Sequence, residues 1–136
     1  MSHWLLKTEP EEFSWADQLK RKFEPWSGVR NAQARNFMRE MKKGDRAFFY
    51  HTGEEKQIVG MVEVVKTFYP DPADDTGRWG LVDVKAVGPM PKPVTLAAIK
   101  AEPRLADLLL VRHSRLSVMP IPDDAWRLIC AMGGYR

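Results

Sequence analysis

Apolar and polar residues follow two periods along the chain, and these predict a mixture of strands and helices. Between residues 81 and 87, apolar residues alternate with Asp83 and Lys85, which is the period of a half-buried strand. Apolar and aromatic runs predict further strands over residues 3–7, 46–51, 58–68 and 116–119.

Helices are predicted where apolar residues return at every third or fourth position. Ala34, Phe37, Met38 and Met41 form such a stripe, in a helix that Asn31 can cap and that we expect to reach about residue 43, ahead of Gly44. Cap and proline signals predict further helices over residues 14–19, 95–100 and 104–109 and from residue 122 onward. The sum is an α+β domain: a curved mixed sheet or small barrel of about five or six strands with flanking helices.

Glycine and proline mark the expected breaks. Gly60 lies inside a predicted strand, which indicates a β-bulge or a close backbone approach. Residues 24–28 are expected to form a loop. Pro89, Pro91 and Pro93 are expected to prevent the strand at 81–87 from continuing.

Length and composition favour one globular domain over residues 1–136. Of 136 residues, 44% are hydrophobic and 29% are charged, and Cys130 is the single cysteine, which excludes an internal disulfide framework. No secretory signal or membrane segment is visible, so we expect a cytoplasmic protein without a membrane partner. We expect a monomer, with a weak dimer as the alternative.

The net charge of +3 is unevenly distributed. Residues 20–46 contain nine basic and three acidic side chains, whereas residues 1–19 contain one basic and four acidic ones. A local basic excess suits an anionic partner, although a solvated helix face explains it equally well.

Enzymatic chemistry has little support in the sequence. The three histidines show no metal-ligand spacing, and neither a phosphate-binding loop nor a catalytic triad is evident. Asp71, Asp74 and Asp75 form either a solvated turn or a cation site, and we expect no metal and no cofactor.

Two tryptophans lie outside the regular elements. Trp26 lies between Pro25 and Gly28, just before the basic helix, and Trp79 follows Gly77 and Arg78. Such a ring either covers the core or stacks on a base, which contributes about 1–3 kcal/mol.

The motif Trp-Ser-Gly-Val-Arg-Asn at residues 26–31 and Arg-Leu-Ser-Val at residues 115–118, with the opening block at residues 4–10, resemble the EVE domain family. The resemblance covers nearly the whole chain. It implies a PUA-like domain related to YTH domains, whose superfamily binds RNA or DNA, several members receiving a modified base in an aromatic pocket. Standalone EVE proteins are not established as enzymes.

The resemblance also implies residue roles. The base pocket would comprise Thr8, Trp26, Ser27, Asn31, Tyr50, His51, Trp79 and Ser117. The basic surface that holds phosphates would comprise Lys7, Arg30, Arg35, Arg39 and Arg115.

Several of these residues have structural alternatives. Asn31 can be only a helix cap, His51 a satisfied interior histidine, and Arg115 a brace of the fold. Arg30 can form an ion pair with Asp45 or Glu9. Thr8 replaces a serine found in many relatives, and the loop before Trp79 is short for the family.

The sequence therefore predicts a non-enzymatic reader that accepts one modified base, such as a methylated one, from RNA or DNA. The expected site is an aromatic slot that is open to solvent and has positive charge at its rim. The alternatives are an enzyme acting on a nucleotide or small heterocycle in the same pocket, with His51 or an acid of the 71–75 loop in the reaction, and a protein-interaction module.

Overall fold

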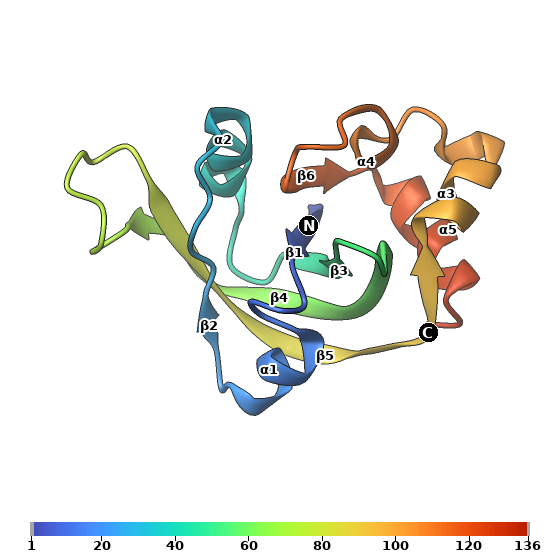
Figure 1. Ribbon diagram of the computed structural model, residues 1–136, viewed down its shortest axis with the longest axis horizontal. Helices are drawn as coiled ribbons and strands as arrows, with labels where there is room; N and C mark the ends of the chain where they lie inside the picture. Colours follow the sequence, from blue (N-terminus) through green and yellow to red (C-terminus); the bar gives the residue numbers. More distant parts are fainter. Residues whose placement is uncertain (1, 136) are drawn as a thin grey trace.

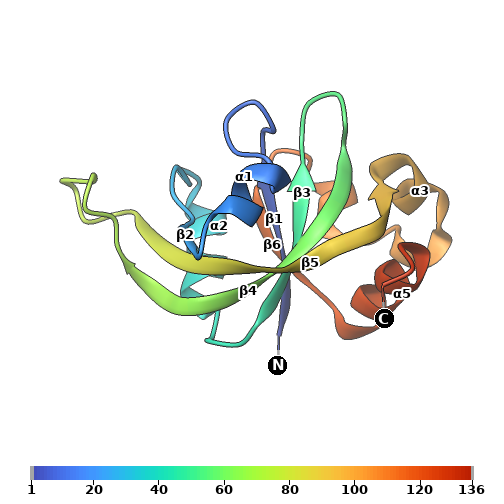
Figure 2. The ribbon, with the colours of Figure 1, turned by 90° about the horizontal axis from the view of Figure 1, so that it is seen from below.

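The computed structural model describes residues 2–135, which form one curved, six-stranded mixed sheet with helices around it (Figures 1 and 2). The strands are β1 (His3–Thr8), β2 (Glu24–Pro25), β3 (Arg46–His51), β4 (Gln57–Pro70), β5 (Gly80–Thr95) and β6 (Val118–Ile121). The helices are α1 (Trp15–Lys20), α2 (Ala32–Glu40), α3 (Leu96–Ala101), α4 (Leu109–Arg112) and α5 (Asp123–Met132), with a 3₁₀ turn at Pro103–Leu105.

The strand order is β2-β5-β4-β3-β1-β6, so β2 and β6 are the outer strands of an open sheet. This confirms the predicted α+β class, and of the two expected forms it is the curved sheet that is present. The long β4–β5 hairpin extends at one end of the molecule beside α2, and α3 and α5 lie at the other end (Figure 1).

Strand register brings three hydroxyl-bearing positions to one edge. Strand β1 is parallel to β3, with Thr8 opposite His51. Both strands therefore finish at the same end of the sheet, and Thr52 follows there. Strand β6 is antiparallel to β1, with Val118 opposite Leu6, and therefore the preceding Ser117 enters from that edge as well.

Helix α1 is fixed by its cap and by a close approach to the sheet. The Ser14 hydroxyl accepts from the N–H of Asp17, whose carboxylate in turn accepts from the N–H of Ser14. The register shifts next to Gly60, where an added Cβ would lie 2.6 Å from the Trp15 ring. Gly60 is thus both the bulge and the close approach that the sequence predicts.

Helix α2 buries Ala34 and Met38 as predicted, but it ends at Glu40 and not near residue 43. Met41 is already extended, and the Asp45 carboxylate accepts the N–H of Lys42 at 3.0 Å. This side-chain acceptor replaces the next helical bond, so the chain turns before Gly44.

The prediction that prolines end the fifth strand is wrong. Strand β5 runs through Pro89, Pro91 and Pro93 to Thr95. Strand β2 pairs only with residues 83 and 84, so beyond them one side of β5 lacks a neighbouring strand. The register with β4 also jumps from Pro89 to Val94, so Pro91 and Pro93 lie in an irregular stretch where no ladder bond to β4 is lost.

Three other boundaries also differ from the prediction. The expected loop at 24–28 begins with β2, and the last strand starts at Val118 and contains Pro120. The helix expected over 104–109 is divided into the 3₁₀ turn and α4, because Leu108 between them is extended.

Candidate functional site

A cavity of about 550 Å³ opens at the edge where Thr8, Thr52 and Ser117 converge. The segment at residues 24–29 forms its opposite side, and residues 7–9, Glu12, Phe13 and Arg21 complete the lining. We call it the Trp26 cavity. Of the eight residues expected in a base pocket, Thr8, Trp26, Ser27 and Ser117 line it.

Trp26 is a fixed wall of this cavity. Its backbone N–H donates to the carbonyl of Val82 at 2.7 Å. Its ring meets the ring of Phe49 edge-on at 5.6 Å and that of Phe13 at 6.2 Å between centroids. Only 6% of the residue is exposed, so the ring belongs mainly to the core and is less open to solvent than the predicted slot; Trp26 nevertheless borders the cavity. A ring held in this way keeps its orientation without a ligand.

The hydroxyl of Thr8 is already used as a donor. It donates to the carbonyl of Phe13 at 2.9 Å, and the Thr8 carbonyl accepts from the N–H of Thr52 at 2.9 Å. The Thr8 oxygen can therefore only accept a hydrogen bond from a ligand. Ser27 is exposed and Ser117 half-buried, and each places a further hydroxyl in the lining.

The charges around the cavity are mixed. Lys7 and Arg21 stand against Glu9, Glu12 and Glu24, so the expected positive rim does not hold here. Lys7 donates through Nζ to the carbonyl of Ser114 at 3.0 Å, and burial lowers the pKa of its ammonium. Burial raises the pKa of the Glu24 carboxyl. The lining thus offers both donors and acceptors to a neutral, polar ring.

His51 is buried and serves helix α1. Its Nε2 accepts a hydrogen bond from the backbone N–H of Trp15 at 3.0 Å, and its Nδ1 lies 2.9 Å from Oε1 of Glu55. The structure therefore gives His51 the interior role, and it is not among the residues that line the Trp26 cavity.

Asn31 and Tyr50 also lie outside the lining of this cavity. Asn31 Oδ1 accepts the N–H of Ala34 at 2.9 Å and caps α2. Tyr50 is 3% exposed, and burial raises the pKa of its phenol to about 12.

Trp79 is not brought to the Trp26 cavity either. Its ring lies instead close to two arginines: the guanidinium carbon of Arg30 is 5.6 Å from the ring centroid and that of Arg35 is 5.3 Å away. Arg30 also pairs with Asp71 at 3.5 Å, and not with Asp45 or Glu9 as the ion-pair alternative expected.

The other predicted basic residues are spread over the surface. Lys7 lines the Trp26 cavity, Arg39 is exposed and lies over the Phe68 ring at 5.2 Å, and Arg115 is exposed. The structure thus gathers Arg30 and Arg35 on one face together with Arg78, whose carbonyl accepts from Arg35 at 3.2 Å.

The acidic loop folds around its own backbone. Asp71 Oδ1 accepts the N–H of Ala73, and Asp74 accepts the N–H groups of Thr76 and Trp79. Within residues 2–135, no three His, Cys, Asp or Glu side chains lie close enough together to hold a metal ion.

Sequence reasoning missed all three acidic lining residues, Glu9, Glu12 and Glu24, and also Thr52. Parallel pairing of β1 and β3 places Thr52 beside Thr8, but the pairing itself is not readable from the sequence. Glu24 enters the site because β2 adds to β5.

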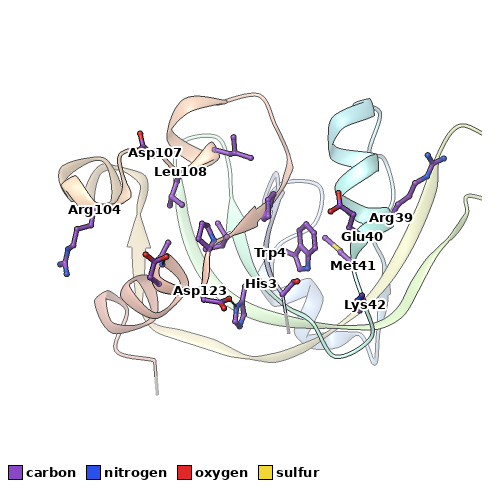
Figure 3. Close-up of a pocket in the computed structure, with 17 residues that line it drawn as sticks. His3, Trp4, Arg39, Glu40, Met41, Lys42, Arg104, Asp107, Leu108 and Asp123 are labelled. Atoms are coloured by element: carbon purple, nitrogen blue, oxygen red, sulfur yellow. Dashed lines mark hydrogen bonds and ion pairs between the residues drawn. The ribbon is translucent and has the colours of Figure 1, made fainter.

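A larger cavity, of about 1100 Å³, lies at the opposite end of β1 (Figure 3). His3 and Trp4 lie at its centre, the end of α2 on one side, and Arg104 and Leu108 on the other. His3 pairs there with Asp123 at 3.0 Å. None of the residues expected in the base pocket lines it.

The fold and the sequence together define the class of protein. The sequence model of the EVE domain family matches residues 2–132. The chain therefore belongs to the EVE domain family, which confirms the resemblance.

Particular relatives are similar along nearly the whole chain. Human thymocyte nuclear protein 1 is 33% identical, over 96% of this chain and 73% of that protein. The solution structure of Rpa0253 from Rhodopseudomonas palustris has a TM-score of 0.93 at 50% identity and covers 98% of this chain and 94% of that one.

The human protein was also solved with a nucleic acid. The crystal structure of human THYN1 in complex with DNA containing 5-methylcytosine has a TM-score of 0.91 at 32% identity. The match covers 100% of this chain and 99% of that chain.

Between residues 2 and 135, no helix has the length and apolar character needed to cross a membrane. The cytoplasmic location and the monomeric state stay predictions.

Proposed function

We propose that this protein reads nucleic acid without catalysing a reaction, by accepting one modified base in the Trp26 cavity. The observation that carries the proposal is the cavity itself: Trp26 lines it together with Thr8, Ser27, Thr52 and Ser117, with carboxylates and an ammonium group around it. The human relative in complex with 5-methylcytosine-containing DNA supports a methylated cytosine as the base.

A flat ring is suited to this cavity. Base stacking on an aromatic side chain contributes about 1–3 kcal/mol, and a ring already held by Phe49 and Phe13 needs little ordering on binding. Burying one methyl group adds about 0.8 kcal/mol, a preference of about fourfold.

The polar lining suits the edge of cytosine. Its exocyclic amino group donates, and a glutamate carboxylate such as that of Glu24 accepts from such a group. Its ring nitrogen and carbonyl oxygen accept, and the Lys7 ammonium retains donors after its bond to Ser114. Thymine and uracil carry a carbonyl in place of the amino group, which a carboxylate repels.

A binding titration tests the proposal. Fluorescence anisotropy compares a short single-stranded DNA that contains one central 5-methylcytosine with the unmodified strand. The wild type is expected to prefer the modified strand by about fourfold. Ser117→Leu, which fills the cavity from its rim, is expected to remove the preference, whereas Arg127→Gln on the exposed face of α5 retains it.

Trp26→Phe gives a second, independent result. It keeps an aromatic ring in the core but shortens the wall, so the preference is expected to fall without loss of the fold. Equal affinity of the wild type for both strands, or an unchanged preference in both cavity variants, contradicts the proposal.

The enzyme alternative finds no support at His51. Both ring nitrogens of His51 already have partners, so neither is free to act as a general base on a ligand.

A further inference from the structure

Arg30 and Arg35 are held against one ring at a short distance from the Trp26 cavity. Trp79 contacts both guanidinium groups, at 5.6 and 5.3 Å from its centroid. Arg30 comes from the segment that follows the cavity wall, Arg35 from α2 and Trp79 from the tip of the β4–β5 hairpin, which lies beside α2 (Figure 1). Two segments that are distant in sequence, residues 30–35 and the loop that ends at Trp79, therefore meet at this ring.

Hydrogen bonds within the loop at residues 71–79 fix the backbone of Trp79. Asp74 Oδ2 accepts the N–H of Trp79 at 2.9 Å, and the Trp79 carbonyl accepts the N–H of Asp71 at 3.1 Å. The carboxylates of Asp71 and Asp74 thus bind backbone N–H groups of the loop, and Asp71 also contacts Arg30 at 3.5 Å, whereas Asp75, the third aspartate of the loop, is exposed.

The two guanidinium groups keep donors for a ligand. Arg30 donates to the Val29 carbonyl at 3.0 Å, and its side chain is 47% exposed. Arg35 donates to the carbonyl of Arg78 at 3.2 Å and to Asn36. A guanidinium has five N–H donors, so each arginine retains at least two.

We propose that Trp79 holds Arg30 and Arg35 as a preorganised clamp for the phosphates of the strand whose base enters the Trp26 cavity. The two sites are neighbours along the chain, because Trp26, Ser27, Gly28 and Val29 line the cavity and Arg30 is the next residue. Trp79 therefore orders two cations and does not stack on a base. The clamp deepens the proposed function and rests on its nucleic-acid ligand.

Preorganisation is the physical reason for this arrangement. A free arginine side chain loses rotamer freedom when it grips a phosphate, whereas a side chain already held on an aromatic face loses less. Planar guanidinium groups also match the oxygens of a phosphate in pairs.

The test uses an unmodified, labelled single-stranded DNA, with anisotropy measured over a series of salt concentrations. For the double variant Arg30→Gln/Arg35→Gln, the negative slope of log affinity against log salt is expected to become shallower by about 1.4, because each lost phosphate contact contributes about 0.7. Affinity falls about 10- to 30-fold at about 0.1 M salt. Lys100→Gln on α3 is the charge control at the far end of the molecule (Figure 1).

Trp79→Leu separates the clamp from charge alone. It keeps both arginines, so the salt slope is retained, but affinity is expected to fall about threefold because the guanidinium groups are no longer ordered. Trp79→Phe, which restores an aromatic face, is expected to recover part of the loss. Circular dichroism verifies that each variant is folded.

The outcomes distinguish the clamp from the cavity. A clamp acts on modified and unmodified strands by the same factor, whereas the cavity determines only the preference between them. Loss of affinity in the clamp variants supports the clamp even if the wild type shows no preference. Arginine variants that bind like Lys100→Gln overturn the clamp, as does tighter binding to a polyglutamate peptide than to the strand.

Discussion

The backbone N–H of Trp15 donates a 3.0 Å hydrogen bond to Nε2 of His51. The Nδ1 position then carries the ring proton and donates to Glu55 at 2.9 Å. His51→Ala leaves a buried N–H without an acceptor and is expected to lower the free energy of unfolding by about 1–3 kcal/mol. Urea denaturation measures this change.

Glu55→Gln is the milder control, because the Glu55 side chain is 43% exposed and glutamine can still accept. Loss of binding in His51→Ala at unchanged stability would show that His51 acts on the ligand.

The partly buried ammonium of Lys7 is expected to destabilise the folded protein and to strengthen its binding to DNA. Burial lowers the pKa of its ammonium, so the unfolded chain binds more protons than the folded one just below pH 10.5. Stability should rise with pH in that window for the wild type and not for Lys7→Met. The methionine variant should also melt higher at neutral pH and bind DNA more weakly.

Thermal melts across alkaline pH measure this dependence, with Lys92→Met as an exposed control. A Lys7→Met variant that is less stable than the wild type at neutral pH would contradict the assignment.

The hydroxyl of Thr8 is expected to contribute more to the free energy of unfolding than its methyl group does. Thr8→Val removes the donor to the Phe13 carbonyl and should lower the free energy of unfolding by about 1–2 kcal/mol. Thr8→Ser keeps the hydroxyl and should stay within about 1 kcal/mol of the wild type. Chemical denaturation compares the two variants. Equal losses of stability in both would contradict a stabilising role for the Thr8 hydroxyl.

The Asp74 carboxylate is expected to make the stability of the protein depend on pH in the acidic range. Hydrogen bonds from Thr76 and Trp79 lower its pKa to about 2. Its contribution to stability is therefore present above the ordinary value of 3.8 and is lost as the pH falls toward 2. Asp74→Asn should melt lower than the wild type at neutral pH, and the difference should shrink in acid.

Asp75→Asn, one residue away on an exposed position, is the matched control for this measurement. A melting difference that is independent of pH would contradict the role given to the Asp74 carboxylate.

The fold could be predicted where local chemistry decides it. The Ser14 and Thr95 caps begin helices, the 46–51 run is a strand with those bounds, and Gly60 marks a bulge. Prediction failed in two other ways. At the end of α2, a side chain three residues on, Asp45, accepts from Lys42, which the apolar stripe does not reveal. At β5, the pairing with distant strands decides, and the short β2 leaves an edge that tolerates prolines.

The candidate site was predictable only in part for the same reason. Thr8, Trp26 and Ser117 could be identified from the resemblance, but the pairing of β1 with β3 and β6 is what brings two of them together. Trp79 and Trp26 look alike in the sequence, as loop tryptophans beside glycine. Only the tertiary structure shows one ring against Phe49 and the other against two arginines.

The most direct test of the central claim is an intermolecular NOE measurement on the complex. A single-stranded DNA carrying one 5-methylcytosine with a ¹³C-labelled methyl group reports which protein protons lie near that methyl. The account predicts NOEs from the methyl group to the indole protons of Trp26 and to the side chain of Thr8 or Ser117. NOEs to Trp79 alone, or to residues of the larger cavity such as Trp4, would contradict it.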